Sequence, residues 1–280
     1  MGVRSMGEEG NHSTDGAAVM GTSWWRGRAR GVRVGVAVLA GSVLVAACSA
    51  EPAEKETADT SRQTQNGSVM MSDNSDSGPV DVPVEQANKA LLRAAKDGDA
   101  DGVRTALNQK AQVETRDGSG RTPLMIAVLD DNLPVAKVLM EFEADPDAKD
   151  DRGESPWVNT GVTGSVAMME LLLPAQPDLT LRNRFGGNAL IPAAEKGHLD
   201  YVREVLRQTD IDIDHVNDLG WTALLEAVYY GNGSAVYRDI VRVLVDNGAN
   251  VSIRDAKGRT AYDHAVRRGF SEIAAMVKPT

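Results

Sequence analysis

Cysteine and aromatic residues are scarce in this sequence. Cys48 is the single cysteine among 280 residues, which excludes a disulfide within the chain and a zinc site built from several cysteines. Aromatic side chains make up 4% of the residues, so a core based on large rings is not expected. Hydrophobic residues nevertheless reach 42%, which favours short helices rich in Leu, Val and Ala. We therefore predict an all-α solenoid.

The sequence also lacks the features of a nucleic-acid-binding protein. Its formal net charge is −10 at pH 7, and no stripe of Lys and Arg with interleaved aromatic residues occurs. An acidic chain repels the phosphate backbone, so a nucleic-acid partner is not expected. The negative charge mainly supports solubility.

Motifs of catalysis and metal binding are missing as well. No H-E-x-x-H, G-x-S-x-G or phosphate-binding loop is found. Of the four histidines, His12 lies near the amino terminus and His198 follows a glycine at a position that favours a structural role. His215 and His264 have no sequence-close partner at a metal-ligand spacing. We therefore predict no cofactor, no metal and no enzymatic activity.

Residues 1–47 have the features of a secretory signal peptide. Four arginines between Arg26 and Arg33 precede an uncharged run of 14 residues, Val34 to Ala47. A helix that spans a membrane needs about 20 apolar residues, so this run is too short to be one. A basic flank, a short apolar stretch and small residues at its end are typical of a signal peptide. Met20 is an alternative to Met1 as the translation start.

The residues Val45-Ala46-Ala47-Cys48 resemble the lipobox of bacterial lipoproteins at all four positions. This resemblance implies that the chain is cut before Cys48 and that Cys48 carries lipid, including fatty acids such as palmitate. Two or three acyl chains form a durable membrane anchor because each buried methylene contributes about 0.8 kcal/mol. The implied location is extracytoplasmic, with the protein lipid-anchored to the bacterial cell membrane, or at the outer membrane or in the periplasm if the cell is diderm. The alternative is a buried structural cysteine behind an ordinary signal peptide.

Residues 48–85 are predicted to be the lipidated cysteine and a disordered linker. The segment is rich in Ser, Thr, Asp, Glu and Gln and has few large apolar residues. Such a composition cannot bury enough surface to offset the entropy lost on ordering. A tether of roughly 36 residues would average on the order of 30 Å from end to end, which would lift the following domain off a membrane.

One sequence pattern recurs through residues 86–280. Each occurrence starts with a polar residue, continues with small and apolar residues, and is predicted to begin a helix. The separations between its occurrences are 33, 33, 33, 34 and 38 residues. The polar residues that mark the six occurrences are Lys89, Thr122, Ser155, Asn188, Thr222 and Thr260. A period near 33 is that of ankyrin units.

Two blocks in each unit resemble the ankyrin consensus G-x-T-P-L-H-x-A and I-V-x-L-L-L-x-x-G-A-D/N. Repeat two reads Gly120-Arg121-Thr122-Pro123-Leu124-Met125-Ile126-Ala127, and repeat five ends in Asn247-Gly248-Ala249-Asn250. The resemblance implies a stack of about six helix–turn–helix units with short hairpin loops. We place the repeats near 86–117, 118–150, 151–183, 184–217, 218–255 and 256–280.

The recurring residue types have structural roles that follow from their chemistry. Thr or Ser at the start of each block can cap the first helix, and Pro123 and Pro156 suit its first turn. The glycine two residues before the cap is expected to need a positive φ. These glycines are Gly120, Gly153, Gly186, Gly220 and Gly258. Small residues are expected where the two helices of a unit pack closely, at Ala127, Ala193, Ala227 and Ala265.

Repeats two to six depart from the consensus at its histidine. The residues that replace it are Met125, Val158, Ile191, Leu225 and Asp263. Packing must therefore substitute for the hydrogen bond of that histidine. Repeat three also carries Asn159-Thr160-Gly161 where alanines are usual, so we expect its first helix to be short or irregular.

The last two repeats depart in other ways. Repeat five has five extra residues, which we place in the turn between its helices, around Asn232–Arg238. Repeat six carries Arg267, Arg268 and Glu272, which we expect to form the polar closing face that an end repeat needs.

Ankyrin stacks usually bind proteins through their hairpin tips and the exposed faces of their first helices, so the resemblance implies a protein partner. Exposed aromatic residues in one group are typical of interface hot spots. The candidate partner-binding residues are Phe185, Leu219, Trp221, Tyr229, Tyr230, Arg121, Arg152 and Lys257. One alternative is that Trp221 and Tyr230 pack against neighbouring repeats. Another is an enzyme or ligand sensor with an unrecognised site in the groove. We expect a monomer.

Overall fold

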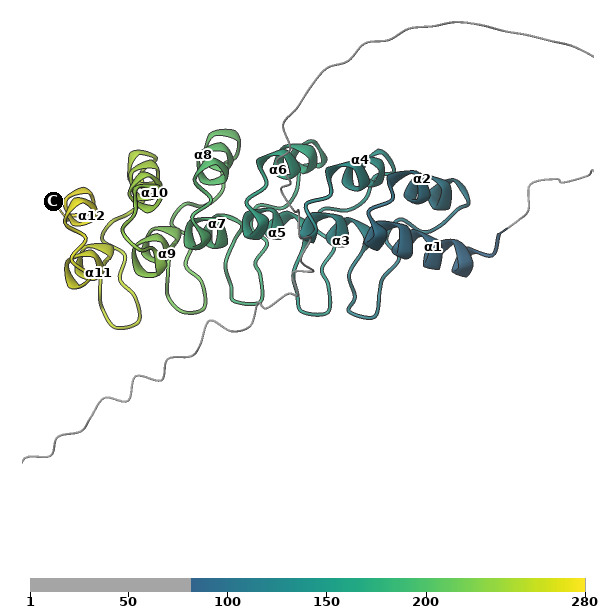
Figure 1. Ribbon diagram of the computed structural model, residues 1–280. Helices are drawn as coiled ribbons and strands as arrows, with labels where there is room; N and C mark the ends of the chain where they lie inside the picture. The colour runs from purple at the N-terminus through teal and green to yellow at the C-terminus, as the bar shows by residue number, and fades with distance from the viewer. Residues whose placement is uncertain (1–81, 280) are drawn as a thin grey trace, which may run out of the picture. The chain divides into compact units, whose positions relative to one another are not determined.

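The computed structural model describes residues 82–279, and these contain twelve α-helices and one short 3-10 helix, η1 (Figure 1). The elements are α1 (Val84–Asp97), α2 (Ala100–Asn108), α3 (Pro123–Leu129), α4 (Leu133–Glu141), α5 (Pro156–Thr163), α6 (Val166–Leu172), η1 (Leu173–Ala175), α7 (Leu190–Lys196), α8 (Leu199–Gln208), α9 (Ala223–Tyr230), α10 (Ala235–Asp246), α11 (Ala261–Arg267) and α12 (Ser271–Met276). The predicted signal peptide, the lipobox with Cys48 and the linker as far as residue 81 lie outside the described residues. Within 82–279, no helix has both the length and the apolar character needed to cross a bilayer.

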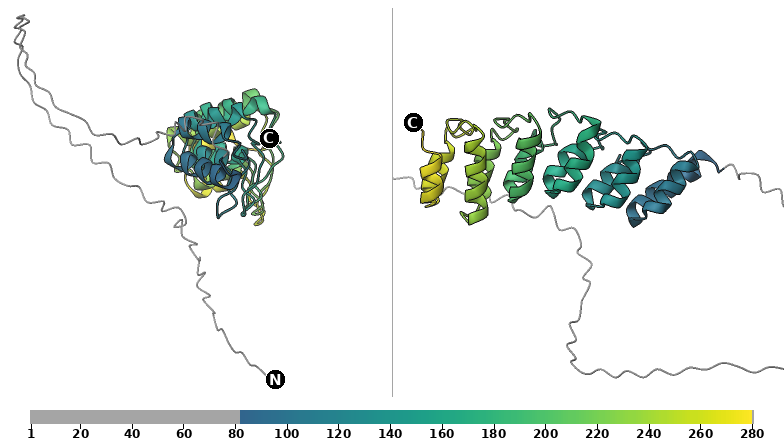
Figure 2. Two further views of the ribbon diagram at one scale, coloured as in Figure 1. Left: turned by 90° about the vertical axis from the view of Figure 1, so that its right-hand side faces the viewer. Right: turned by 90° about the horizontal axis from the view of Figure 1, so that it is seen from above.

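The helices form two rows, and each repeat contributes one helix to each row. The odd-numbered helices pack on one another in chain order, and the even-numbered helices do the same (Figure 1). Viewed from above, successive helix pairs lie side by side (Figure 2). One pair is too small to cover its own apolar face, so the core lies between neighbouring pairs. The predicted all-helical ankyrin-type solenoid is confirmed.

Helix caps and tip glycines adopt the local geometry that the sequence predicts. The Oγ1 atoms of Thr122 and Thr222 accept hydrogen bonds from the backbone N–H groups of Met125 and Leu225, at 3.2 and 3.3 Å. The five glycines that lie two residues before the caps, at the hairpin tips, have φ between 72° and 80°. A residue with a Cβ atom would be strained in this conformation. Their loops project from the side of the stack that bears the odd-numbered helices (Figure 1).

An Asp or Asn side chain closes each of these hairpins, a role that the sequence analysis did not assign. Its Oδ1 atom accepts hydrogen bonds from the backbone N–H groups two and four residues later, at 2.8 to 3.1 Å. The five residues are Asp117, Asp150, Asn183, Asn217 and Asp255. Short polar side chains that bond their own backbone favour turns in this way. The hairpin tips are therefore held in one repeated conformation.

Repeat one begins differently from the pattern. Lys89 does not start a helix but lies exposed inside α1, where it forms an ion pair with Glu85 at 2.7 Å. The helix starts at Val84, directly after Pro83. Proline disfavours a helical conformation in the residue before it, so the chain enters the helix after Pro83.

The first helix of repeat three is regular, so the expectation that it is short or irregular was wrong. α5 has eight residues, as many as α9. Asn159 donates a hydrogen bond to the carbonyl of Ser155 at 3.0 Å, and the Oγ1 atom of Thr160 lies 2.7 Å from the hydroxyl of Tyr201. These buried polar side chains fit the helix because each has a hydrogen-bond partner.

The insertion in repeat five mostly lengthens a helix. α10 starts at Ala235 and has 12 residues, so only residues 231–234 form the turn between the helices. The placement of the whole segment up to Arg238 in that turn was therefore wrong. The added turn of helix is tied to repeat four, because the hydroxyl of Tyr237 donates to the carbonyl of Glu195 at 2.9 Å.

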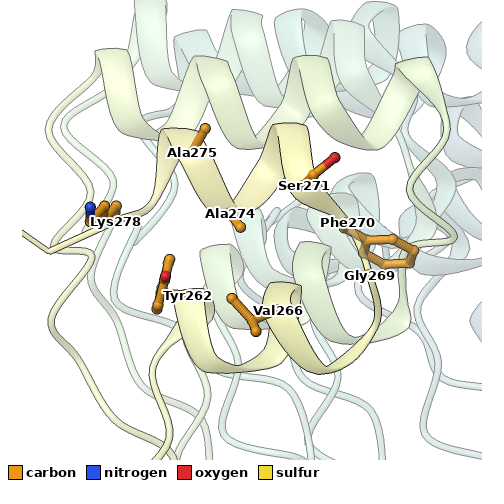
Figure 3. Close-up of a pocket in the computed structure, with 8 residues that line it drawn as sticks. All are labelled: Tyr262, Val266, Gly269, Phe270, Ser271, Ala274, Ala275 and Lys278. Carbon is orange, nitrogen blue, oxygen red and sulfur yellow. The ribbon is translucent and has the colours of Figure 1, made fainter.

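The end of the stack is less polar than expected. A hollow of about 390 Å³ lies on repeat six, where Tyr262, Val266 and Phe270 are among the residues that line it (Figure 3). Arg268 and Glu272 do not line this hollow. Glu272 instead pairs with Arg238 of repeat five at 3.0 Å. The predicted polar closing face is therefore incomplete, because part of its charge turns toward the preceding repeat.

Candidate partner-binding surface

Four of the candidate residues gather on the hairpins and first helix of repeats four and five. Phe185 and Leu219 occupy the two hairpin tips and are 54% and 56% exposed. Tyr229 and Tyr230 end α9 and are 40% and 46% exposed, with their rings 5.0 Å apart. We call these four residues the repeat four–five surface. Clustered apolar side chains with this much exposure are unusual away from a binding site.

Contacts between the two hairpins hold this surface in place. The backbone N–H of Asp218 donates to the carbonyl of Phe185 at 2.9 Å, and the ring of His215 bonds the carbonyl of Gly186 at 2.7 Å. The neighbouring tips are thereby fixed beside each other. Phe185 and Leu219 are presented by a rigid support rather than by independent loops.

Trp221 takes the packing role that the sequence analysis left open. It is half-buried against the core, and its ring lies 4.2 Å from that of Tyr229 in an edge-to-face arrangement. The ring of His264 of repeat six lies 5.8 Å from that of Trp221 and 5.3 Å from that of Tyr229, so the three rings form one group. Tyr230, for which the same role was considered, remains exposed. Trp221 therefore mainly packs against the two tyrosines, and less of its own surface is free to contact a partner.

The three basic candidates lie on other hairpins. Arg121 is held by Asp117 in a fork of hydrogen bonds at 2.8 and 3.1 Å. Arg152 is exposed on the hairpin before α5, and Lys257 is exposed on the hairpin before α11. None of the three lines the hollow between the aromatic candidates. The structure therefore brings together the apolar candidates and leaves the basic ones apart.

A hollow of about 200 Å³ opens within the repeat four–five surface. Phe185, Leu219 and Tyr230 form apolar walls, and Pro192 of α7 adds to them. Two carboxylate residues, Glu195 and Glu226, line the same hollow. Neither residue is among the candidates predicted from the sequence.

Glu226 is the unusual group of this hollow. It is only 4% exposed, its Oε1 atom accepts a hydrogen bond from Nδ2 of Asn217 at 2.8 Å, and its Oε2 atom has no hydrogen-bond partner. Burial, with a contribution from the negative charge of Glu195, raises the pKa of Glu226 to about 7, although the hydrogen bond from Asn217 opposes the rise. A sequence signal was available, because Glu226 is the only acid in the apolar helix Ala223–Tyr230.

The next repeat has a histidine at the equivalent position, four residues after the cap. Nε2 of His264 lies 2.8 Å from Oδ2 of Asp255, the residue that closes its own hairpin. Burial alone would raise the pKa of Asp255, but hydrogen bonds from the backbone of Arg259 and from His264 outweigh it and lower that pKa. In both repeat five and repeat six, the residue that closes the hairpin is therefore hydrogen-bonded to the residue four positions after the helix cap. In repeat six the contact pairs an acid with a histidine, whereas in repeat five it leaves one oxygen of Glu226 without a partner.

The histidines in the part of the chain that the structure describes are bonded to other protein groups rather than gathered in a metal cluster. Residues 82–279 contain no cluster of three or more His, Cys, Asp or Glu side chains that could hold a metal ion. Nε2 of His198 lies 3.2 Å from the carbonyl of Val162, which confirms its structural role. In this range no Ser or Thr hydroxyl is hydrogen-bonded to a histidine.

The fold defines a helical repeat protein, and its candidate binding surface lies on the hairpin tips and the end of α9. A family model described as ankyrin repeats (3 copies) matches residues 69–150 and 161–255. The chain is 36% identical to the ankyrin repeat protein YahD of Escherichia coli K12 over 186 residues, which cover 66% of this chain and 92% of that protein. This chain belongs to the ankyrin repeat family. Ankyrin repeats bind protein partners, and the fold is typically a non-enzymatic scaffold.

Two solved structures of the same fold come from bacteria. An ankyrin repeat domain from Acinetobacter baumannii AYE has a TM-score of 0.64 and 41% identity, over 67% of this chain and 95% of that chain. A chain in the complex of a predatory endopeptidase from Bdellovibrio bacteriovorus with an immunity protein has a TM-score of 0.58 and 26% identity. That match covers 68% of this chain and 96% of that chain.

Proposed function

We propose that this protein is a lipid-anchored, extracytoplasmic scaffold that captures a protein partner with the repeat four–five surface. The observation that carries the proposal is the group of four exposed apolar side chains, two on hairpins that are bonded to each other and two at the end of α9. Preorganised aromatic side chains at an interface lose little conformational entropy on binding. The solved complex of an endopeptidase with an immunity protein supports an enzyme as one class of partner.

The anchoring part of the proposal rests on the lipobox-like residues 45–48 and on the segment that follows them. An anchor at Cys48 and a linker up to residue 85 would present the repeat domain at a distance from the membrane. A partner in the cell envelope would then meet the surface without crossing a membrane.

The alternative, an enzyme or a ligand sensor, is less well supported by the groove. Its hollow of about 200 Å³ is smaller than the roughly 300–1,000 Å³ typical of small-molecule sites. The carboxyl of Glu226 has a pKa suited to proton transfer, but no nucleophile is assembled beside it. A surface that receives side chains of a protein fits these dimensions better.

Site-specific crosslinking tests the surface. A photoreactive residue in place of Leu219, incorporated in the native cell envelope, is expected to give a discrete crosslinked product that mass spectrometry can identify. Arg203 is exposed on α8, in the other row of helices, and provides the matched control position. Equal products from both positions, or a product from position 203 alone, would show that the partner binds elsewhere.

Replacement of the lipid attachment site tests the anchor. In a Cys48→Ala variant, we expect almost all of the protein to move from the membrane fraction to the soluble fraction, because no thiol remains to be acylated. Incorporation of labelled palmitate should be lost as well. Ser49→Ala, one residue further on, should keep both properties. A Cys48→Ala protein that still sediments with membranes would contradict lipid anchoring at this residue.

A further inference from the structure

A buried carboxylate oxygen without a partner is rare, because an unsatisfied buried acceptor costs free energy. Oε2 of Glu226 is such an atom, and it belongs to a side chain that lines the hollow of the repeat four–five surface. Asn217 does not satisfy it, since its Nδ2 atom donates to Oε1 and its Oδ1 atom accepts from two backbone N–H groups. The second oxygen is therefore an unused acceptor on a side chain that lines the hollow.

The charge of the hollow favours a cation. Glu195 lines it together with Glu226, and none of the ion pairs between residues 82 and 279 involves either of these two residues. The guanidinium of Arg184 is held by Glu154 at 3.2 Å and lies 4.7 Å from the ring centre of Phe185. It forms no hydrogen bond with Glu226. Two neighbouring carboxylates without a cation would repel an acidic ligand and attract a basic one.

The walls of the hollow suit the rest of a basic side chain. Phe185, Leu219 and Pro192 offer apolar surface to the methylene groups of lysine or arginine, which commonly pack in this way beneath a charged head group. The ring of Tyr230 is an aromatic surface for the cation itself. A volume of about 200 Å³ is suited to one side chain. A metal ion is disfavoured, because no third His, Cys, Asp or Glu side chain joins the two carboxylates, and Oδ1 of Asn183 and of Asn217 already accepts two backbone N–H groups.

From these contacts we propose that the hollow receives one lysine or arginine side chain of the partner protein, whose cationic group is bound by Glu226 and Glu195. This inference rests on the proposed function, because it assigns a chemistry to the partner of the same surface. It predicts that a basic residue next to an apolar one is the central contact of the partner. The carboxylates then select for that residue by charge.

Peptide selection on the full chain tests the inference. Random peptides displayed on phage would be selected on the wild-type protein, and the binders would be synthesised and measured by fluorescence anisotropy. We expect one position to be enriched in Arg or Lys. Glu226→Gln keeps the acceptor for Asn217 but removes the charge, and it should weaken these peptides at least tenfold. Glu195→Gln should weaken them severalfold, and Glu204→Gln on α8 should leave them unchanged.

Replacement of the basic residue in the peptide completes the test. Citrulline in place of arginine, or norleucine in place of lysine, should weaken binding of the peptide to the wild type about tenfold. The same replacement should have little effect on binding of the peptide to the Glu226→Gln variant. Peptides that need Phe185 and Tyr230 but carry no basic residue would overturn this inference and leave the proposed surface standing. Selected peptides that bind Phe185→Ala and Tyr230→Ala as tightly as the wild type would contradict the proposed surface itself.

Discussion

A Gly161→Ala variant is expected to lose roughly 3 kcal/mol or more of its free energy of unfolding, at the upper end of the usual cost of overpacking. Gly161 is buried in α5, and a Cβ atom added there would overlap the backbone carbonyl oxygen of Ala189 in repeat four. A backbone group cannot move aside as a flexible side chain can. Repeats three and four would therefore have to separate, and their shared core would be exposed.

Urea unfolding followed by circular dichroism measures this loss. Gly118→Ala is the matched control, because a Cβ at residue 118 would have no atom within 4 Å. That control should stay within about 0.5 kcal/mol of the wild type. An unchanged unfolding midpoint for Gly161→Ala would mean that α5 and the start of α7 do not approach each other as closely as described.

A Glu226→Gln variant is expected to change how stability depends on pH. The pKa of this carboxyl is about 7 in the folded protein and 4.5 as its reference value. Well below pH 4.5 the carboxyl is protonated in both the folded and the unfolded state, so its ionisation does not affect the free energy of unfolding. As the pH rises from 4.5 through 7, the unfolded state loses its proton first, so the wild type loses stability. At about 1.4 kcal/mol per pKa unit, the loss reaches about 3 kcal/mol near pH 8.

The measurement compares the unfolding free energies of wild type and variant between pH 5 and 8. The difference should shift in favour of Glu226→Gln as the pH rises, since glutamine has no charge to bury. Glu204→Gln is a useful control, because the hydrogen bond from Arg207 lowers the pKa of Glu204 and places its titration below this range. Parallel pH profiles for wild type and Glu226→Gln would show that Glu226 ionises normally. The negative charge of Glu195 helps to raise the pKa of Glu226, and the charge of Glu226 helps to raise the pKa of Tyr230, so part of the difference between the two proteins arises from these two neighbours.

Much of the fold could be predicted from local sequence. Thr122 and Thr222 cap their helices, and the tip glycines have positive φ, because these properties depend on a few consecutive residues. The errors arose where distant contacts compensate for unusual residues. α5 stays regular because Thr160 meets Tyr201 of the next repeat, 41 positions along the chain. No local pattern contains that contact.

The candidate site was predicted only in part. Exposed apolar residues at the tips were visible in the sequence because the repeat fixes which positions form the tips. The different roles of Trp221 and Tyr230 were not, since His264 of repeat six and the core decide which ring is covered. Glu226 was missed because an acid in a helix normally lies on its exposed face.

By itself, the sequence determined the period, the helical class and the positions of the turns, because caps, glycines and apolar spacing act within one repeat. Only the tertiary structure decided which side chains meet across repeats. The hollow exists because two hairpins are bonded to each other and α7 lies beside α9. Burial and electrostatic repulsion act through space, so the unpaired oxygen of Glu226 and its neighbour Glu195 became apparent only after the repeats were stacked.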